Sequence, residues 1–201
     1  MILLADLEYF APIIFYSDLN KYSHCVFDQY EEYQKMSFRN RCTLLGGNGP
    51  INLSIPLVGG RGQKTLMKDI RISNTDNWQG RHWKTIVSCY NRSPWFEYYR
   101  DELEKMYRNR VESLMEWNLT CFRWVTDKMS IEIPVSLTEA PVNGVDKQQV
   151  EDRRNRFLPS TINRRFPESV RYPQVFEDRF GFIPHLSILD LLFCEGPGGL
   201  E

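Results

Sequence analysis

One short segment gathers many of the side chains that could do chemistry. Residues 81–99 read RHWKTIVSCYNRSPWFEYY and include a histidine, a cysteine and several aromatic residues. His82 is a candidate general acid or base, because the unperturbed pKa of imidazole lies near neutrality. Cys89 lies seven residues further on, so on one helix the two side chains are about 10 Å apart along the axis. A Cys–His pair requires hydrogen-bond contact, and this spacing excludes it within a straight helix.

The same segment also has a structural interpretation. Trp78, His82, Ile86 and Tyr90 recur at every fourth position, as on one face of a helix. In this interpretation Cys89 is a small core residue and His82 is a hydrogen-bonded histidine among aromatic rings. The residues alone leave both roles of His82 open.

A second candidate site is the basic segment YEEYQKMSFRNRC, residues 30–42. In an extended chain Arg39 and Arg41 lie on one face and Asn40 on the other. Two guanidinium groups on one face suit a phosphate or a carboxylate, and Lys35 is close by in the sequence. Ordinary surface salt bridges are the alternative. The loop GGRGQKT, residues 59–65, adds glycines and basic residues but lacks the Walker A order.

Composition argues against several classes of protein. The 201 residues carry 25 basic and 26 acidic side chains, a net charge of −1, which disfavours a general nucleic-acid binder. The five cysteines and three histidines show no metal-ligand spacing, so we expect reduced thiols and no metal site. No signal peptide and no apolar run of the ~20 residues needed for a membrane span is recognised. We expect a cytoplasmic protein; its cofactor and oligomeric state are not indicated.

The strands and helices expected around these residues indicate an α/β or α+β domain. Apolar runs at 2–5 and 24–28 flank a helical segment and predict a strand–helix–strand unit. The glycines at 46–49 predict a hairpin turn between two strands. Further strands are expected at 68–73 and 131–136, and further helices from 78 to Pro94, from Pro94 onward, at 110–129 and at 186–194.

The predicted architecture is a single domain over residues 1–201, with a mixed sheet of about four to five strands covered by helices. Residues 137–170 are polar, contain prolines and lack periodicity. We expect them to form a surface excursion or a lid within that domain.

Several segments together resemble the WbqC-like protein family. They are YFAPI at 9–13, NR before a strand, a strand ending in IP, DIRI, NWxxxHWKTIxxxYxxxPxFEYY and FGFIPxLSILDLLFxxGP. The resemblance extends over most of the chain and is weakest at 137–170. The chain lacks the His/Gln-Pro motif with which the longer branch of the family begins, and His185 replaces an expected asparagine. The matching motif positions are Asn40, Arg41, Trp78, His82, Tyr90, Pro94 and Phe96.

The resemblance implies a role in the biosynthesis of surface polysaccharide of the O-antigen type. It suggests a transferase that attaches an amino acid, such as glycine, or another acyl group to a sugar. In that hypothesis His82 and Tyr90 are catalytic and Asn40 helps to stabilise the oxyanion. Lys35, Arg39, Asn40, Arg41 and Trp78 would bind the substrate, an anionic nucleotide-linked sugar or acyl donor. The alternative is a non-catalytic protein that binds a phosphorylated metabolite or a protein partner.

Overall fold

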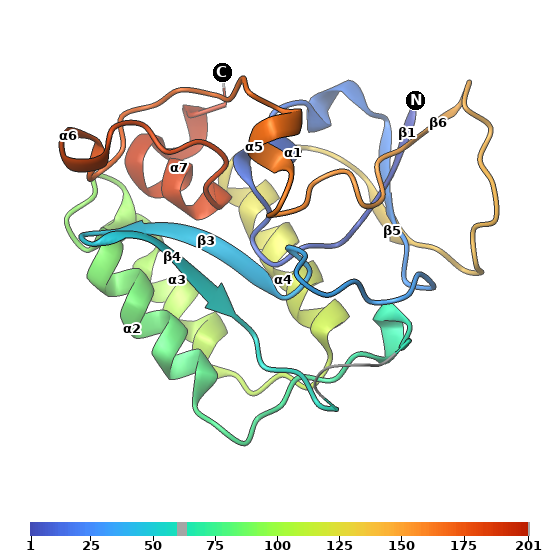
Figure 1. Cartoon of the computed structure of the whole chain (residues 1–201), viewed down its shortest axis with the longest axis horizontal. Helices are drawn as coiled ribbons and strands as arrows, with labels where there is room; N and C mark the ends of the chain where they lie inside the picture. Colours follow the sequence, from blue (N-terminus) through green and yellow to red (C-terminus); the bar gives the residue numbers. More distant parts are fainter. Residues whose placement is uncertain (60–63, 201) are drawn as a thin grey trace.

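A four-stranded parallel sheet forms one side of the molecule (Figure 1). The computed structural model describes residues 1–59 and 64–200. The strands lie in the order β5-β2-β1-β6 and are β1 (Ile2–Ala5), β2 (His24–Phe27), β5 (Val135–Leu137) and β6 (Val150–Asp152). Each neighbouring pair is parallel, so all four carboxyl ends meet at one edge of the sheet.

The strand order creates a switch point between β1 and β6. The chain runs from β1 to β2 and on to β5 in one direction, then crosses to β6 on the other side of β1. In open parallel sheets, ligands bind outside the carboxyl ends of the strands where the connections diverge. The fold therefore predicts a site at the carboxyl ends of β1 and β6.

The two remaining strands form a separate antiparallel hairpin. β3 (Arg41–Gly46) pairs with β4 (Gly49–Ser54), with Gly46 opposite Gly49, so the predicted turn between the glycines is confirmed. Figure 1 shows the hairpin crossing α2 (Trp78–Tyr90). The backbone N–H of Leu45 donates to the Tyr90 hydroxyl at 3.2 Å and ties the hairpin to this helix.

Side-chain caps set the starts of three long helices, because the first N–H groups of a helix have no partner within it. Asn77 caps α2, Ser113 caps α4 (Leu114–Lys128) and Ser187 caps α7 (Ile188–Glu195). The fourth long helix, α3 (Phe96–Arg108), starts shortly after Pro94, as predicted. The short helical segments are α1 (Ile13–Tyr16), α5 (Ile162–Arg165), α6 (Glu177–Phe180) and 3-10 turns at Leu19–Lys21, Met67–Asp69 and Gly196–Gly198.

Helix α4 joins the two halves of the core. Toward the parallel sheet, the ring of Phe122 lies 5.0 Å from that of Phe27 in β2. Nearer its amino terminus, the ring of Trp117 lies 5.7 Å from that of Trp78 in α2. Because all four rings are buried, the sheet and the helical half share one continuous aromatic core.

The predicted α/β fold class is confirmed, and the parallel and antiparallel strands lie in two separate sheets. The predicted strand at 68–73 is wrong. That segment holds the 3-10 turn Met67–Asp69 and makes isolated bridges at Arg71 and Ile72, because its backbone pairs only briefly with two loops. The central part of the loop 59–65 lies outside the described residues.

Residues 137–170 combine surface loops with part of the sheet. Their central strand β6 pairs with β1, with Ile2 opposite Val150. This strand has no apolar run, because its three residues, Val-Glu-Asp, are all at least partly exposed. The expectation that this segment covers a site stays a prediction, as does the single-domain boundary.

Among the helices of the described residues, none combines the length and apolar character needed to cross a lipid bilayer.

Gly196, which ends α7, should not tolerate a side chain. Its φ of 73° and ψ of −154° lie in a region that only glycine adopts readily, and an added Cβ would lie 2.5 Å from the Trp95 ring. We predict that Gly196→Ala lowers the free energy of unfolding by about 2–4 kcal/mol, measured by urea denaturation. Gly198→Ala is the matched control, because its Cβ would meet nothing within 4 Å. Equal effects of the two variants would contradict this account.

Candidate site at the carboxyl edge of the parallel sheet

A buried arginine lies at the carboxyl ends of β1 and β6. Arg39 is 1% exposed, and its Nη2 atom donates to Asp6 at 2.9 Å, to Glu31 at 2.6 Å and to Asn155 at 3.1 Å. Its Nε atom donates to the same oxygen of Glu31, Oε1, at 3.1 Å. Three distant parts of the chain, at Asp6, at residues 31–39 and at Asn155, therefore meet around one guanidinium group.

The sheet positions these partners. Asp6 directly follows β1, Glu31 lies shortly after β2, and Asn155 lies shortly after β6. The backbone N–H of Asn155 donates to Asp6 at 2.7 Å, while Asn155 holds a left-handed φ of 57°. Asparagine tolerates this conformation better than most residues do. The strands thus bring Asp6, Glu31 and Asn155 to one point at their carboxyl ends.

Arg39 itself is held from the other side. Asn118 of α4 donates through Nδ2 to the carbonyl of Arg39 at 2.7 Å and to that of Leu7 at 3.1 Å. The backbone N–H of Tyr9 donates to the carbonyl of Phe38 at 2.9 Å. These bonds fix the segment that follows β1 against the segment that carries the arginine.

The cluster contains more negative than positive charge. Asp6, Glu8 and Glu31 surround the single cation of Arg39 and are mostly buried. Burial, with Asp6 and Glu31 nearby, raises the pKa of Glu8 well above its usual range, and Arg39 only partly opposes this. Within the described residues the Oε2 atom of Glu8 has no hydrogen-bond partner. The surroundings therefore favour the protonated form of Glu8, since burying another unpaired charge is unfavourable.

Glu31 connects the cluster to solvent. It lines a hollow of about 460 Å³ together with Asp152, Arg154 and Asn155. Burial and Asp6 raise the pKa of Glu31, while the hydrogen bonds from Arg39 oppose this shift. Both of those bonds use Oε1. A carboxyl group with a raised pKa at a solvent-facing hollow is suited to accept and return a proton.

A second hollow of about 440 Å³ adjoins the first. Both are lined by Asp152, Arg154 and Asn155, and the second is also lined by Arg156, Arg165 and Phe166. The first hollow lies on the side of the buried carboxylates and the second on the side of the arginines.

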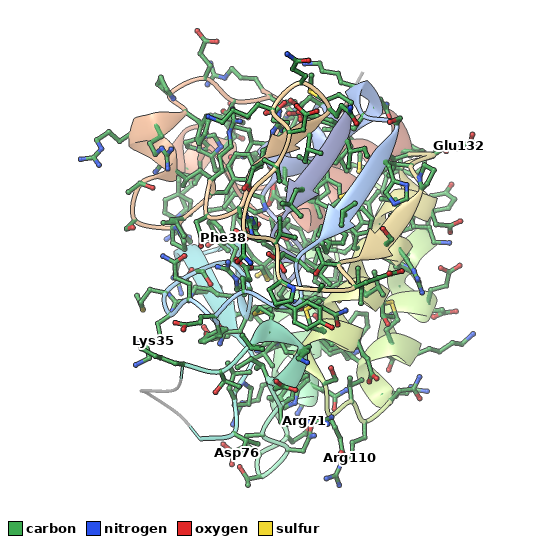
Figure 2. The ribbon with its side chains drawn as sticks, turned by 90° about the vertical axis from the view of Figure 1, so that its right-hand side faces the viewer. Lys35, Phe38, Arg71, Asp76, Arg110 and Glu132 are labelled. Atoms are coloured by element: carbon green, nitrogen blue, oxygen red, sulfur yellow. The ribbon has the colours of Figure 1, made fainter. Side chains whose placement is uncertain are left out.

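The residues predicted to bind substrate lie in different surroundings. Arg39 is occupied by its three partners, and its Nη1 atom is buried without a partner among the described residues. Lys35 is exposed and points away from the body of the protein (Figure 2). Arg41 begins β3, and its Nη2 atom lies 3.6 Å from the sulfur of Met36. Arg39 and Arg41 therefore have no common partner in the part of the chain that is described.

Asn40 and Trp78 make contacts within the protein. Asn40 accepts a hydrogen bond from Tyr33 at 2.8 Å and donates to the carbonyl of Ile55 at 2.9 Å. Trp78 is 1% exposed and donates to Asn74 at 3.1 Å. These contacts account for both residues by packing, and a substrate-binding role for them stays a prediction.

His82 lies within the aromatic core. The Tyr9 hydroxyl is 3.0 Å from its Nδ1 atom, and the rings of Trp78 and Tyr107 pack against it. Burial lowers the pKa of His82 to about 4, so the imidazole is neutral at pH 7. A catalytic base works best with a pKa near the working pH. These features favour a structural role, and the catalytic role stays a prediction.

Tyr90 belongs to a third buried group, centred on Asp190 of α7. Tyr90 and Tyr172 donate to the two oxygens of Asp190 at 2.6 and 2.8 Å. Burial raises the pKa of Asp190 to about 6, although both hydrogen bonds oppose the shift. Because Tyr90 is fully buried, its hydroxyl is committed to this group and to Leu45. Its catalytic role likewise stays a prediction.

Within residues 1–59 and 64–200, no group of three or more histidine, cysteine or carboxylate side chains is placed to hold a metal ion.

The sequence interpretation missed Asp6, Glu8, Glu31 and Asn155. A signal existed for Asp6, since an acidic residue directly after the apolar run ILLA lies at the carboxyl edge of a parallel sheet. No comparable signal existed for Asn155, because the strand before it has no recognisable hydrophobic pattern.

The two buried groups should have opposite effects on stability between pH 4 and 6.5. The pKa of His82 is lowered from 6.5 to about 4. Its contribution to the free energy of unfolding is therefore fully present above pH 6.5 and is lost as the pH falls through 4. The pKa of Asp190 is raised from 3.8 to about 6. Its contribution to the free energy of unfolding is therefore fully present below pH 3.8 and is lost as the pH rises through 6. Each effect amounts to about 3 kcal/mol.

Urea denaturation across this pH range tests both assignments. Relative to the wild type, the free energy of unfolding of Asp190→Asn should rise more with pH, because the aspartate effect is removed while the effects of the other buried groups, Glu8 and Glu31 among them, are shared. Relative to the wild type, that of His82→Gln should rise less or fall more with pH, because the histidine effect is removed. Parallel profiles in both variants would contradict the assignments.

Comparison with family models supports one assignment. The model of the WbqC-like protein family matches residues 8–158, well over half of the chain, and this range includes Glu8, Glu31, Arg39 and Asn155. Comparison with curated proteins and with solved structures gave no match. The chain therefore belongs to the WbqC-like protein family.

Proposed function

We propose that the protein is a cytoplasmic transferase of surface-polysaccharide biosynthesis, which moves an amino acid such as glycine, or another acyl group, onto a sugar. The family, which is associated with polysaccharide biosynthesis, supports the general role. The observation that carries the proposal is Glu31, a carboxyl group with a raised pKa at the edge of a hollow, oriented by a buried arginine.

The negative charge around Glu31 suits an amine as the acceptor. Asp6 and Glu31 outnumber the cation of Arg39, while Asp152 in the same hollow is paired with Arg154. An amino sugar that arrives as an ammonium ion is attracted to this charge. It must lose a proton before its nitrogen can attack a carbonyl carbon, and a nearby carboxylate can take that proton.

The proposed reaction begins with a proton transfer. Glu31 accepts a proton from the ammonium ion, and the free amine attacks the acyl carbon of an activated donor. The new C–N bond forms, the bond to the activating group breaks, and that group leaves with the electron pair. The second proton lost by the nitrogen passes to solvent or to the leaving group. Arg39 acts as a positioning residue, because its two hydrogen bonds to Oε1 hold the carboxyl group of Glu31 at the hollow.

Substitution of Glu31 tests the proposal. We predict that Glu31→Gln lowers kcat on the order of 10²–10⁴-fold, the usual contribution of a general base, while the fold is retained. Glutamine can still accept the hydrogen bonds from Arg39, and one negative charge is removed from a repulsive cluster. The assay follows mass gain on amino-sugar nucleotides supplied with acyl-CoA or aminoacyl-adenylate donors. In the wild type, kcat/KM should fall as the pH is lowered, because Glu31 must be ionised.

Glu32→Gln is the matched control. It removes the same charge one residue away, from an exposed side chain that does not line the hollow. Equal rates in the two variants would contradict the role of Glu31. Tight binding of an amino-sugar nucleotide without any mass gain would instead favour the non-catalytic binding protein.

A further inference from the structure

The hollow beside the Glu31 site carries excess positive charge. The chain from residue 151 to residue 165 contains five arginines and two carboxylates. Three of these arginines, Arg154, Arg156 and Arg165, line the hollow of about 440 Å³ together with a single carboxylate, Asp152. Its charge is therefore opposite in sign to that of the neighbouring cluster around Glu31.

The three arginines of the lining differ in their ion pairs. Arg154 is paired with Asp28 at 2.6 Å and with Asp152 at 2.7 Å. Arg156, in contrast, shares Oε1 of Glu151 with Arg153, at 2.9 and 2.7 Å respectively. Arg153 has a second partner in Asp18, at 2.7 Å, whereas Arg156 has only this shared oxygen of Glu151 as an ion-pair partner among the described residues.

Arg165 is the least neutralised of the three. Among the described residues it forms no ion pair, and its one hydrogen bond is to the carbonyl of Arg156 at 3.4 Å. That bond places the side chain of Arg165 beside the backbone of Arg156. Both guanidinium groups belong to the lining of the same hollow, so an anion there can contact both.

Phe166 supplies the apolar part of the lining. Its ring packs 5.2 Å from that of Phe157, and the guanidinium carbon of Arg156 lies 5.5 Å from its centre. His185 donates through Nε2 to the carbonyl of Phe166 at 2.7 Å and fixes the backbone there. The hollow therefore combines the guanidinium group of Arg165, which has no ion pair among the described residues, that of Arg156, which shares a carboxylate oxygen, and an aromatic ring in a fixed position.

We propose that this hollow binds the diphosphate of a sugar-diphosphate substrate through Arg156 and Arg165. A diphosphate carries several charged oxygens, which two guanidinium groups can bind together, whereas a single carboxylate offers only two. The two hollows share Asp152, Arg154 and Asn155, so one ligand can present its amine to Glu31 and its diphosphate to Arg165. This inference rests on the proposed function and names the class of its acceptor.

Calorimetric titration of the intact chain tests the proposal without turnover. The probes are uridine diphosphate, geranyl diphosphate and uridine, because a diphosphate on a sugar can be attached to a nucleoside or to a lipid. We predict that at least one diphosphate binds, and that uridine binds at least about 10-fold more weakly. Arg165→Gln should weaken diphosphate binding about 10-fold or more, as expected for the loss of a charge-assisted hydrogen bond.

Arg164→Gln is the matched control, because Arg164 is an exposed neighbour with the same charge that does not line the hollow. It should weaken binding less than about 3-fold, since exposed charges are screened by salt. Equal losses in the two variants, uridine binding as tight as that of uridine diphosphate, or no binding of either diphosphate would each overturn the proposal. Binding of either diphosphate with the predicted loss supports it and identifies the source of the group.

The binding test of the diphosphate site can fail or succeed independently of the activity test of the proposed function. Glu31→Gln should leave diphosphate binding within about 3-fold of the wild type, because Glu31 lines only the first hollow. Binding that depends on Arg165 in a protein without transferase activity would uphold the diphosphate site and reject the reaction. Transferase activity in a protein that does not bind a diphosphate through Arg165 would uphold the reaction and reject the diphosphate site.

Discussion

The burial of one guanidinium group organises the carboxyl edge of the parallel sheet. Moving such an ion out of water costs several kcal/mol unless opposite charges and hydrogen bonds surround it. Around Arg39 those groups are Asp6, Glu31 and Asn155, which follow three different strands. The ends of β1, β2 and β6 must therefore come together for this charge to be compensated. The positions of both hollows follow from that arrangement.

The compensation exceeds what charge neutrality requires. One carboxylate would balance Arg39, yet Asp6, Glu8 and Glu31 all lie nearby, and the pKa values of both glutamates are raised. Repulsion between neighbouring carboxylates destabilises the folded state. Clusters of carboxyl groups with raised pKa values are concentrated at functional sites. The group around Asp190 differs, because it lies among tyrosine hydroxyls in the core and lines neither of the two hollows. The two buried acidic groups therefore differ in their access to the hollows.

The sequence predicted the elements with strong local signals. The apolar runs of β1 and β2, the glycine turn of the hairpin and the helix that Asn77 caps all formed close to their expected positions. The segment 68–73 had a strand-like composition, but it lies between two loops and found no strand to pair with. β6 had no apolar pattern, because its pairing with β1 alone places it in the sheet.

The candidate site was harder to predict than the fold. The sequence marks Arg39 as a candidate for binding an anion, whereas in the structure its guanidinium group is buried and paired within the protein. Its actual partners lie up to 116 residues away, and no local pattern relates Arg39 to Asn155. The family resemblance drew attention to His82 and Tyr90, whose spacing also fits a buried helix face. Burial, which favours the structural interpretation, depends on the packing of α2 against the rest of the chain.

The late position of β6 in the sequence also affects how the protein forms during its synthesis. A ribosome releases the segments that carry Asp6, Glu31 and Arg39 long before it releases Asn155. Until then the arginine cannot acquire its full set of partners, and it gains by staying hydrated. Contacts between such distant residues form slowly, because a long loop must close before they contribute any stability. We therefore expect the carboxyl edge of the sheet to be among the last parts of the newly made chain to become ordered.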